Sequence, residues 1–446
     1  MNIVDIILKK RNGKILSPEE ISFFVSGVKE KTLPDYQISA LLMAIFFRGL
    51  SKKETSLLTK EMARSGDRLS FPEITDPIVD KHSSGGVGDK TSLVIAPVVA
   101  ACGLPIAKLS GRGLGFTGGT VDKLESIPGF RTEISKEDFI RFVQEDGISI
   151  IGQSGDIAPV DKVLYALRDV TGTVDSIPLI AASIMSKKLA DGSDAIVLDV
   201  KYGSGAFMKS PEKAIKLARE MVAIGEDNHK RTIALVTDMD QPLGSAVGNN
   251  LEVIEAIETL QGHGPEDFRR ECQALVEAML MAGGKCETRK EAWEAYRRVI
   301  EDGSAFRKFR KMVENQGGDV SYIDDPEKFP KAPLCLEARA EEAGFVTKIN
   351  AEEIGKSSLL LGAGRLRTED TINPAVGLRI ERKVNDPVAV GDVLFRVYAQ
   401  DEKTGKEAME KAKKAYRISE EKTAAKKMGP VIALVSKEGV EERQGE

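Results

Sequence analysis

Histidine, cysteine and tryptophan are scarce in this chain of 446 residues, which contains three, four and one of them, respectively. The cysteines (Cys102, Cys272, Cys286 and Cys335) are far apart and form no Cys-x-x-Cys pair, which argues against a zinc site and against a disulfide framework. We expect them to be buried free thiols of a cytoplasmic protein. Among the few histidines, His82 stands out because it lies in the most glycine-rich stretch of the chain.

Long apolar runs and an excess of positive charge are also missing. No segment reaches the roughly 20 apolar residues of a membrane-spanning helix, and residues 1–13 are typical of a short amphipathic helix rather than of a signal peptide. The formal net charge is −5 with 30% charged residues, which argues against a general nucleic-acid-binding protein. We therefore expect a globular protein of two or three domains that binds neither nucleic acid nor a membrane.

Strands that alternate with helices dominate the middle of the chain. Short β-branched runs alternate with helical segments over residues 68–158 and 193–333, which predicts an α/β domain with a largely parallel sheet. Residues 159–192 interrupt this alternation with two helices and no strand between them. We expect them to pack with residues 1–67, which are helical throughout, in one discontinuous all-helical domain.

The last hundred residues change pattern again. Strand-like runs with turn signals between them predict a C-terminal α+β domain over residues 334–446, with Val431–Val435 as one of its strands. Pro387–Asp392 looks like the hairpin of a lipoyl-like sandwich, but no lysine stands at its tip for modification. Lys403–Lys427 is predicted to be a solvated, charged helix. We expect this domain to be structural or to support a dimer.

Two glycine-rich loops follow apolar strands between residues 79 and 129. Gly85-Gly86-Val87-Gly88 comes after Lys81-His82-Ser83, and a second loop that begins at Gly111 comes after Lys108-Leu109-Ser110. Glycine allows positive φ and close approach of the backbone to a ligand, and N–H groups at the start of a helix bind anions. A lysine and a hydroxyl before each loop add donors for phosphate oxygens. Since ligands of parallel sheets gather at the carboxyl ends of strands, the pattern predicts a phosphate site.

Several side chains near these loops are candidates for chemistry. His82 has an ordinary pKa near neutrality and could carry a proton, although a purely structural histidine is the alternative. Thr120 begins the helix after the second loop, where its hydroxyl and N–H can face the anion. Asp122 and Glu125 on that helix could instead merely hold Arg112 or a cap. No Gly-x-x-x-x-Gly-Lys-Ser/Thr is present, which argues against an ATP-hydrolysing P-loop.

A second group of candidates lies on the two inserted helices. Arg168 is on the first, and Ser183 and Lys187, four residues apart, share one face of the second. A guanidinium, a hydroxyl and an ammonium that converge would suit the carbonyls and ring N–H of a uracil-type heterocycle. The alternative for Lys187 is a surface lysine whose stem covers apolar neighbours.

The segment Ser110–Glu125 (SGRGLGFTGGTVDKLE) matches the signature of the thymidine and pyrimidine-nucleoside phosphorylases. The resemblance covers essentially the whole chain, including Lys81-His82-Ser83, Ser176-Ile177-Pro178-Leu179-Ile180 and Asp199-Val200-Lys201. Within the family, the chain looks most like bacterial pyrimidine-nucleoside phosphorylases, which accept both uridine and thymidine. The resemblance implies the type II nucleoside phosphorylase fold and a homodimer formed through the helical domain.

The resemblance also implies roles for individual residues, of which His82, Arg168 and Lys187 would be catalytic. Phosphate would be held by Lys81, His82, Ser83, Ser92, Lys108, Ser110 and Thr120. The base would be held by Arg168, Ser183 and Lys187, with Leu114, Tyr165, Ile180 and Phe207 as walls. A potassium ion would lie near Gly88, Lys90, Leu243, Ala246 and Glu255, and no organic cofactor is implied.

Two positions depart from the family pattern. Phe116 stands where the family commonly has histidine, and Lys90 stands where close relatives often have threonine, so that only the backbone of residue 90 could contact a cation. The implied reaction is reversible phosphorolysis of uridine, thymidine or deoxyuridine to the free base and (deoxy)ribose 1-phosphate, in pyrimidine salvage. A strict thymidine phosphorylase, a phosphoribosyltransferase of related fold and a non-catalytic nucleotide-binding module are the alternatives.

Overall fold

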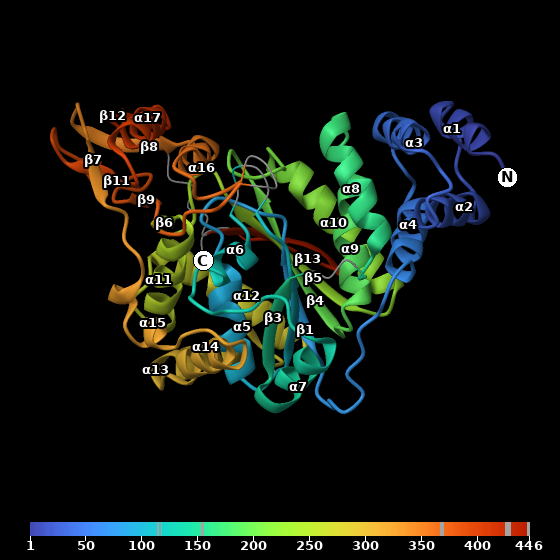
Figure 1. Ribbon diagram of the computed structural model, residues 1–446, viewed down its shortest axis with the longest axis horizontal. Helices are drawn as coiled ribbons and strands as arrows, with labels where there is room; N and C mark the ends of the chain where they lie inside the picture. The colour runs from blue at the N-terminus through green and yellow to red at the C-terminus, as the bar shows by residue number, and fades with distance from the viewer. Residues whose placement is uncertain (114–115, 117, 153–155, 366–369, 424–429, 444–446) are drawn as a thin grey trace.

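Three structural parts follow one another along the longest axis of the molecule (Figure 1). The computed structural model describes residues 1–113, 116, 118–152, 156–365, 370–423 and 430–443. The N-terminal helices lie at one end, an α/β part with a large sheet lies in the middle, and a smaller α+β part lies at the other end. This architecture confirms the predicted fold class.

The helical part combines segments from two regions of the chain. Its members are α1 (Ile3–Arg11), α2 (Pro18–Lys29), α3 (Asp35–Arg48), α4 (Lys52–Arg64), α8 (Pro159–Thr171) and α9 (Ile177–Ala190). Capping boxes begin α2 at Ser17 and α4 at Ser51. One apolar core holds the two segments together, because Leu164 of α8 and Leu179 of α9 pack with Leu58 and its neighbours.

The central sheet has seven strands in the order β14-β13-β5-β4-β1-β2-β3. Its parallel strands are β1 (Val79–Ser83), β2 (Ile106–Ser110), β3 (Ile148–Gly152), β4 (Ala195–Tyr202) and β5 (Arg231–Asp238). The helical elements in this part are α5 (Thr91–Ala101), α6 (Thr120–Leu124), α7 (Lys136–Asp146), α10 (Pro211–Asp227), α11 (Asn249–Leu260), α12 (Glu266–Ala282), α13 (Arg289–Glu301), α14 (Ser304–Asn315), α15 (Ser321–Asp324) and the 3-10 helix η1 (Pro326–Lys328).

Helices cover both faces of this sheet, and the many apolar residues of its strands reflect that burial. In β4, Leu198 and Val200 belong to the core that contains α10, whereas Val197 belongs to the core that contains α5 and α12. Successive strand residues point to opposite faces, so a strand buried on both sides needs an uninterrupted apolar run. The carboxyl ends of β1, β2 and β4 consequently meet at one edge of a rigid layer.

The C-terminal part contains two small sheets, ordered β10-β8-β12 and β6-β9-β11-β7. Its elements are β7 (Leu334–Arg339), β8 (Gly344–Ile349), α16 (Ala351–Leu360), β9 (Gly377–Ile380), β10 (Pro387–Val388), β11 (Val393–Ala399), α17 (Glu402–Lys413) and β12 (Tyr416–Ser419). The short β6 (Ala246–Val247), which precedes α11, pairs with β9 and so attaches this part to the α/β part.

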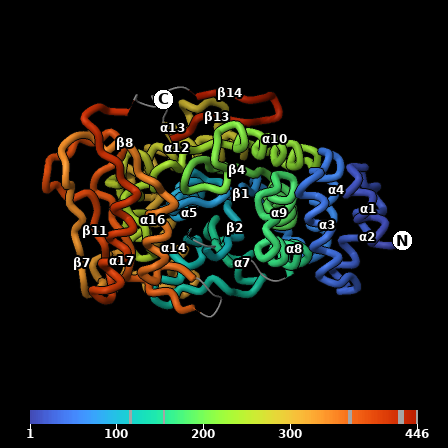
Figure 2. The backbone as a smooth tube through the Cα atoms, turned by 90° about the horizontal axis from the view of Figure 1, so that it is seen from above, coloured from blue at the N-terminus to red at the C-terminus, as the bar shows by residue number. Residues whose placement is uncertain are grey.

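Two expectations about the C-terminal segment are wrong. The strand expected at Val431–Val435 is β13 (Val431–Ser436), which pairs antiparallel with β5 in the central sheet and is followed by β14 (Gly439–Glu442) (Figure 2). Without β13, the buried strand β5 would expose unpaired N–H and C=O groups along one edge. The helix expected over Lys403–Lys427 ends at Lys413, because the chain then forms β12 against β8.

The cysteines and the helices test two expectations that came from composition. All four thiols are free, but only Cys102 and Cys272 are buried, and the expectation of burial is wrong for the exposed Cys335. Its strand β7 alternates between exposed and covered residues, and Cys335 falls on the exposed side. Within the described ranges, every helix is too short or too polar to cross a bilayer.

Candidate active site

The two glycine-rich loops leave the same edge of the sheet. β1 lies between β2 and β4, with Ser83 opposite Asp199, so Lys81, His82 and Ser83 end one strand beside Lys108 on the next. The Lys108 ammonium reaches across and donates to the carbonyl oxygen of Lys81. The structure therefore places the two lysine–hydroxyl pairs side by side, as an anion site requires.

Buried carboxylates hold the first loop in place. Lys81 Nζ lies 2.9 Å from Asp199 Oδ2 and donates to Thr91 Oγ1 at 2.5 Å. The Ser83 hydroxyl donates to Asp89 Oδ2 at 2.5 Å and accepts from the Gly85 N–H at 3.1 Å. Burial raises the pKa of Asp89, but the positive charges of Lys81 and its neighbours outweigh it and keep that pKa well below the ordinary value. Asp89 is thus an ionised carboxylate that holds the first glycine-rich loop from behind.

A second buried network surrounds Lys108. Asp80 lies between Lys108, whose Nζ is 3.4 Å away, and Lys188, with which it forms an ion pair. Lys188 also pairs with Asp191 at 2.9 Å. Burial, and then the neighbouring ammonium groups of Lys188 and Lys81, lower the pKa of Lys108 to about 8 against the opposing effect of Asp80. Among the lysines of this site with a resolved pKa shift, Lys108 therefore has the pKa nearest to neutral pH.

The second loop is held by a charged cluster at its base. Arg112 donates to Glu125 at 2.5 and 2.9 Å and to Asp122 at 3.3 Å, so these carboxylates have the holding role that was the alternative to chemistry. Asp122 also accepts from the Gly113 N–H at 2.6 Å and from Arg365 of the C-terminal part at 2.7 Å. The loop is thereby connected to two parts of the molecule.

The remaining predicted phosphate residues lie around this loop. Ser110 ends β2 and is buried, Ser92 is buried in the first turn of α5, and Thr120 is the first residue of α6. A Cβ on the preceding Gly119 would lie 2.1 Å from the Gly113 nitrogen, so only glycine fits there. Leu114, predicted as a wall of the base site, lies outside the described residues together with Gly115 and Thr117.

The predicted base-binding residues are brought together on α8 and α9. Lys187 donates to the Ser183 hydroxyl at 3.2 Å and forms an ion pair with Asp161 of α8. Arg168 is 2% exposed, and its guanidinium donates to three carbonyls of the α8–α9 connection and of α9. These acceptors are Thr173 O at 3.2 Å, Val174 O at 2.7 Å and Leu179 O at 3.1 Å. Arg168 thus also fixes the connection between the helices, which its spacing did not indicate.

His82 lies next to the predicted phosphate residues Lys81 and Ser83, and the charge of the predicted base residue Lys187 also acts on it. Burial lowers its pKa well below the ordinary value, and so do the positive charges of Lys188, Lys108, Lys187 and Lys81. The environment therefore favours the neutral imidazole, because the positive charges of four lysines add to the effect of burial. A neutral imidazole still has one N–H with which to donate a hydrogen bond.

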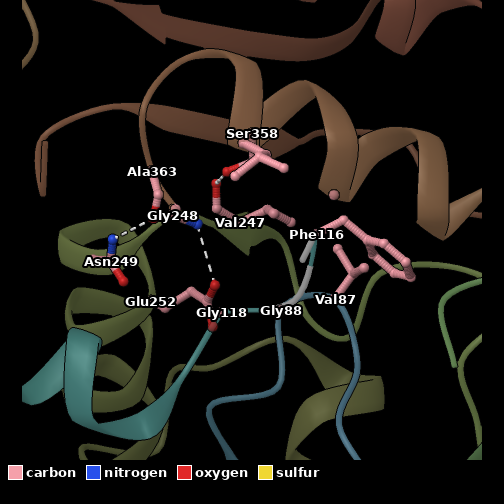
Figure 3. Close-up of a pocket in the computed structure, with 13 residues that line it drawn as sticks. Val87, Gly88, Phe116, Gly118, Val247, Gly248, Asn249, Glu252, Ser358 and Ala363 are labelled. Atoms are coloured by element: carbon pink, nitrogen blue, oxygen red, sulfur yellow. Dashed lines mark hydrogen bonds between the residues drawn. The ribbon is translucent and has the colours of Figure 1, made fainter. Parts of the chain in front are cut away.

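Phe116 and the remaining predicted walls lie as follows. Phe116 packs on α16, since a Cβ on Gly355 would lie 2.7 Å from the Phe116 carbonyl oxygen and 3.0 Å from its ring. Phe116 lines a small pocket between the loops and the C-terminal part (Figure 3). His82 and Lys187 are not among the residues that line this pocket. Tyr165 and Ile180 are half-buried on α8 and α9, and Phe207 is exposed. Phe116 therefore has a packing role.

Sequence reasoning missed the acidic residues that orient the basic ones. Asp80, Asp161 and Asp199 each pair with a predicted site lysine, yet Asp161 is 26 residues from Lys187 in sequence. The only local signal was Asp199 at the end of an apolar strand. Their discovery required the pairing of distant strands and helices.

The residues implied for a potassium ion also meet in space, around a side chain. Lys90 Nζ donates to Leu243 O at 2.9 Å and to Ala246 O at 3.0 Å, and it pairs with the Glu255 carboxylate. The backbone N–H of Lys90 donates to Gly88 O at 3.0 Å. The lysine side chain itself therefore contacts three of the predicted donors.

Comparison with known families places the chain in a class of transferases. A model described as "Glycosyl transferase family, a/b domain" matches residues 75–306, and one described as "Glycosyl transferase family, helical bundle domain" matches residues 4–66. The model "Pyrimidine nucleoside phosphorylase C-terminal domain" matches residues 345–419. The helical and α/β parts thus match glycosyltransferase domains, and the C-terminal part matches a domain of pyrimidine nucleoside phosphorylases.

Similar curated proteins narrow this class. The pyrimidine-nucleoside phosphorylase of Bacillus subtilis (strain 168) is 52% identical over 97% of this chain and 100% of that protein. The enzymes of Staphylococcus haemolyticus (strain JCSC1435) and Geobacillus stearothermophilus are 54% and 52% identical, each over 90% of this chain and 93% of the relative. The chain belongs to the pyrimidine-nucleoside phosphorylase family.

A more distant similarity concerns the fold alone. The crystal structure of anthranilate phosphoribosyltransferase from Thermus thermophilus matches with a TM-score of 0.58 and 20% identity, over 70% of this chain and 98% of that one. The helical and α/β arrangement is therefore shared with a phosphoribosyltransferase.

Proposed function

We propose that this protein catalyses the reversible phosphorolysis of pyrimidine nucleosides in pyrimidine salvage. Its substrates would be uridine, thymidine and deoxyuridine with orthophosphate, and its products the free base and (deoxy)ribose 1-phosphate. The position of His82 carries this proposal, because the charges of both Lys108 and Lys187 act on the same imidazole. A phosphate on one side of that ring and a base on the other would have the sugar between them.

The chemistry follows from the charges that develop at the transition state. A phosphate oxygen forms a bond to C1′ while the bond from C1′ to the base breaks, and the bonding electron pair leaves with the base. Lys187 and Arg168 would stabilise this anionic base more than the neutral nucleoside, which is the requirement for catalysis. The neutral His82 would donate its N–H to a carbonyl of the departing base.

A bound phosphate would also change the charge state of the site. Its negative charge would raise the pKa values of His82 and Lys108, because an opposite charge nearby favours the protonated form of each. Phosphate would therefore restore the protonated state of Lys108 at mildly alkaline pH. The phosphate and base residues lie on different parts of the chain, so we infer that the helical part closes on the loops to bring phosphate and C1′ into attack distance.

The assembly and location of the enzyme belong to the same proposal. Tyr36 and Phe47 of α3 and Val170 of α8 are large apolar side chains that are at least 74% exposed on the helical part. These exposed side chains support a homodimer formed through this part, because an interface there would remove their apolar surface from water. The four unpaired thiols support a cytoplasmic location.

One assay separates this proposal from its alternatives. Uridine is incubated with the enzyme in phosphate or in sulfate of equal ionic strength, and uracil release is followed by absorbance. We expect release only with phosphate and no effect of EDTA. A phosphoribosyltransferase would instead need magnesium and a diphosphate-sugar substrate, and a binding module would release no uracil under any condition. A parallel comparison of uridine with thymidine would separate a strict thymidine phosphorylase.

A further inference from the structure

The ammonium of Lys90 lies where the family resemblance puts a potassium ion. Lys90 is the N-cap residue of α5, directly after the phosphate loop, and its side chain is buried. Its Nζ reaches the carbonyls of Leu243 and Ala246, in the segment between β5 and α11, and the carboxylate of Glu255 on α11. An ammonium has three N–H donors, and these three acceptors use all of them.

The surrounding glycines show how tightly this site is filled. A Cβ on Gly244 would lie 2.3 Å from Glu255 Oε2 and 2.9 Å from Lys90 Nζ, and φ at Gly244 is +67°. A Cβ on Gly88 would lie 2.6 Å from Leu243 O. The same oxygens therefore cannot hold a potassium ion while the lysine is in place. The residues present do not fit the potassium ion that the resemblance implies.

The ammonium of Lys90 carries the same charge as a potassium ion. The Lys90 ammonium forms a buried ion pair with the Glu255 carboxylate. It therefore supplies one positive charge to that carboxylate and to the two carbonyl oxygens, as potassium would. The ring of Phe268, 5.1 Å from Nζ, adds a cation–π contact.

Neighbouring lysines make the same kind of contact. Lys123 Nζ donates to the carbonyls of Asp89 at 3.0 Å and Gly118 at 3.2 Å and pairs with Glu252 at 3.2 Å. Lys383, from the C-terminal part, donates to Gly244 O at 2.8 Å. Ammonium groups of the chain thus neutralise the carbonyls and carboxylates behind the phosphate loop.

We propose that Lys90 is a tethered replacement for a monovalent cation and that this enzyme functions without potassium. The ammonium ties the phosphate loop to α11 and keeps the loop N–H groups and Ser92 in position for phosphate. A covalently attached cation cannot be diluted or exchanged, so phosphate binding and stability become independent of the salt present.

The wild-type enzyme provides the first test. It is dialysed into tetramethylammonium chloride, whose cation is too large for the site, and compared with potassium chloride at equal ionic strength and pH. We expect the same kcat/KM for phosphate and the same melting temperature in both salts. A severalfold activation by potassium, or a melting temperature that rises with potassium concentration, would overturn the proposal, since a ligand that binds only the folded state stabilises it. The melting temperature does not depend on the proposed reaction, so it tests Lys90 even if the substrate is different.

Two variants of Lys90 provide the second test. Lys90→Ala leaves the carbonyls, Glu255 and an empty space, whereas Lys90→Met fills the space with an uncharged side chain of similar length. In tetramethylammonium chloride we expect both variants to melt at a lower temperature than the wild type. Potassium or ammonium chloride should restore part of the loss in Lys90→Ala and none in Lys90→Met. Equal responses of the two variants to potassium would refute the proposal; if neither folds, the wild-type comparison decides.

Discussion

The lowered pKa of Lys108 predicts that phosphate affinity falls as the pH rises through about 8. A lysine with this pKa is charged in about 90% of molecules at pH 7 and in about 10% at pH 9. Lys108 is a predicted phosphate ligand whose charged form would bind the anion, so the dissociation constant should rise about tenfold for each pH unit above 8. The sign follows from the charge that is lost, because the predicted ligand of the anion becomes neutral at high pH.

Calorimetric titration of the enzyme with phosphate measures this effect without nucleoside, whose base also ionises at alkaline pH. With the dissociation constant expressed on the phosphate dianion, we expect little change between pH 7 and 7.5, a rise above pH 8, and uptake of a proton on binding at pH 8.5. The uptake is detected as a dependence of the binding enthalpy on the ionisation enthalpy of the buffer.

The matched variant is Lys108→Gln, which keeps a hydrogen-bond donor but cannot titrate. Its phosphate affinity should be weak at pH 7 and nearly constant up to pH 9. A wild-type affinity that stays constant up to pH 9.5 would refute the reasoning, and so would a Lys108→Gln variant that keeps the alkaline loss with the same midpoint.

Three further predictions concern the buried charges. Lys201→Met should lower the free energy of unfolding by about 3–5 kcal/mol, because it leaves buried carboxylates without their partner. Lys209→Met, at an exposed ion pair, should lower it by less than about 1 kcal/mol. Urea unfolding compares the two variants, and equal losses would contradict a stabilising role of the buried ion pairs. Asp161→Asn should lower kcat by about tenfold to a hundredfold with little effect on phosphate affinity, because Lys187 loses the carboxylate that orients it. Steady-state kinetics measures this effect, and an unchanged kcat would contradict the prediction. The pKa of His82, measured by NMR titration, should lie below the ordinary value in the free enzyme and rise when phosphate is added. A pKa that does not change with phosphate would mean that phosphate binds away from His82.

The order of helices and strands was predictable because each segment carries its own signal. The run Ala195–Leu198 is apolar throughout, as is typical of a strand covered on both faces, and the capping box at Ser51 begins α4 where its spacing indicates. The place of β13 was not predictable. Its apolar residues suit any sheet, and nothing local shows that the open edge of β5, almost 200 residues earlier, is its partner.

The site divides in the same way. Lys81, His82 and Ser83 could be assigned to phosphate because they end a strand before a glycine turn. The role of Asp80 as the acceptor of two buried ammonium groups depends on α9, which comes 108 residues later in the chain. The direction of the Lys90 side chain likewise depends on a turn that begins 153 residues away in sequence. Local chemistry indicated which groups matter, and tertiary pairing determines their charge and direction.

Isotope transfer tests the central claim most directly. The enzyme is given uridine and phosphate labelled with ¹⁸O in all four positions, and the sugar phosphate is analysed by ³¹P NMR. Attack of a phosphate oxygen on C1′ predicts that ribose 1-phosphate retains all four labels and forms in equal amount with uracil. Loss of one label, or release of uracil without sugar phosphate, would contradict the account.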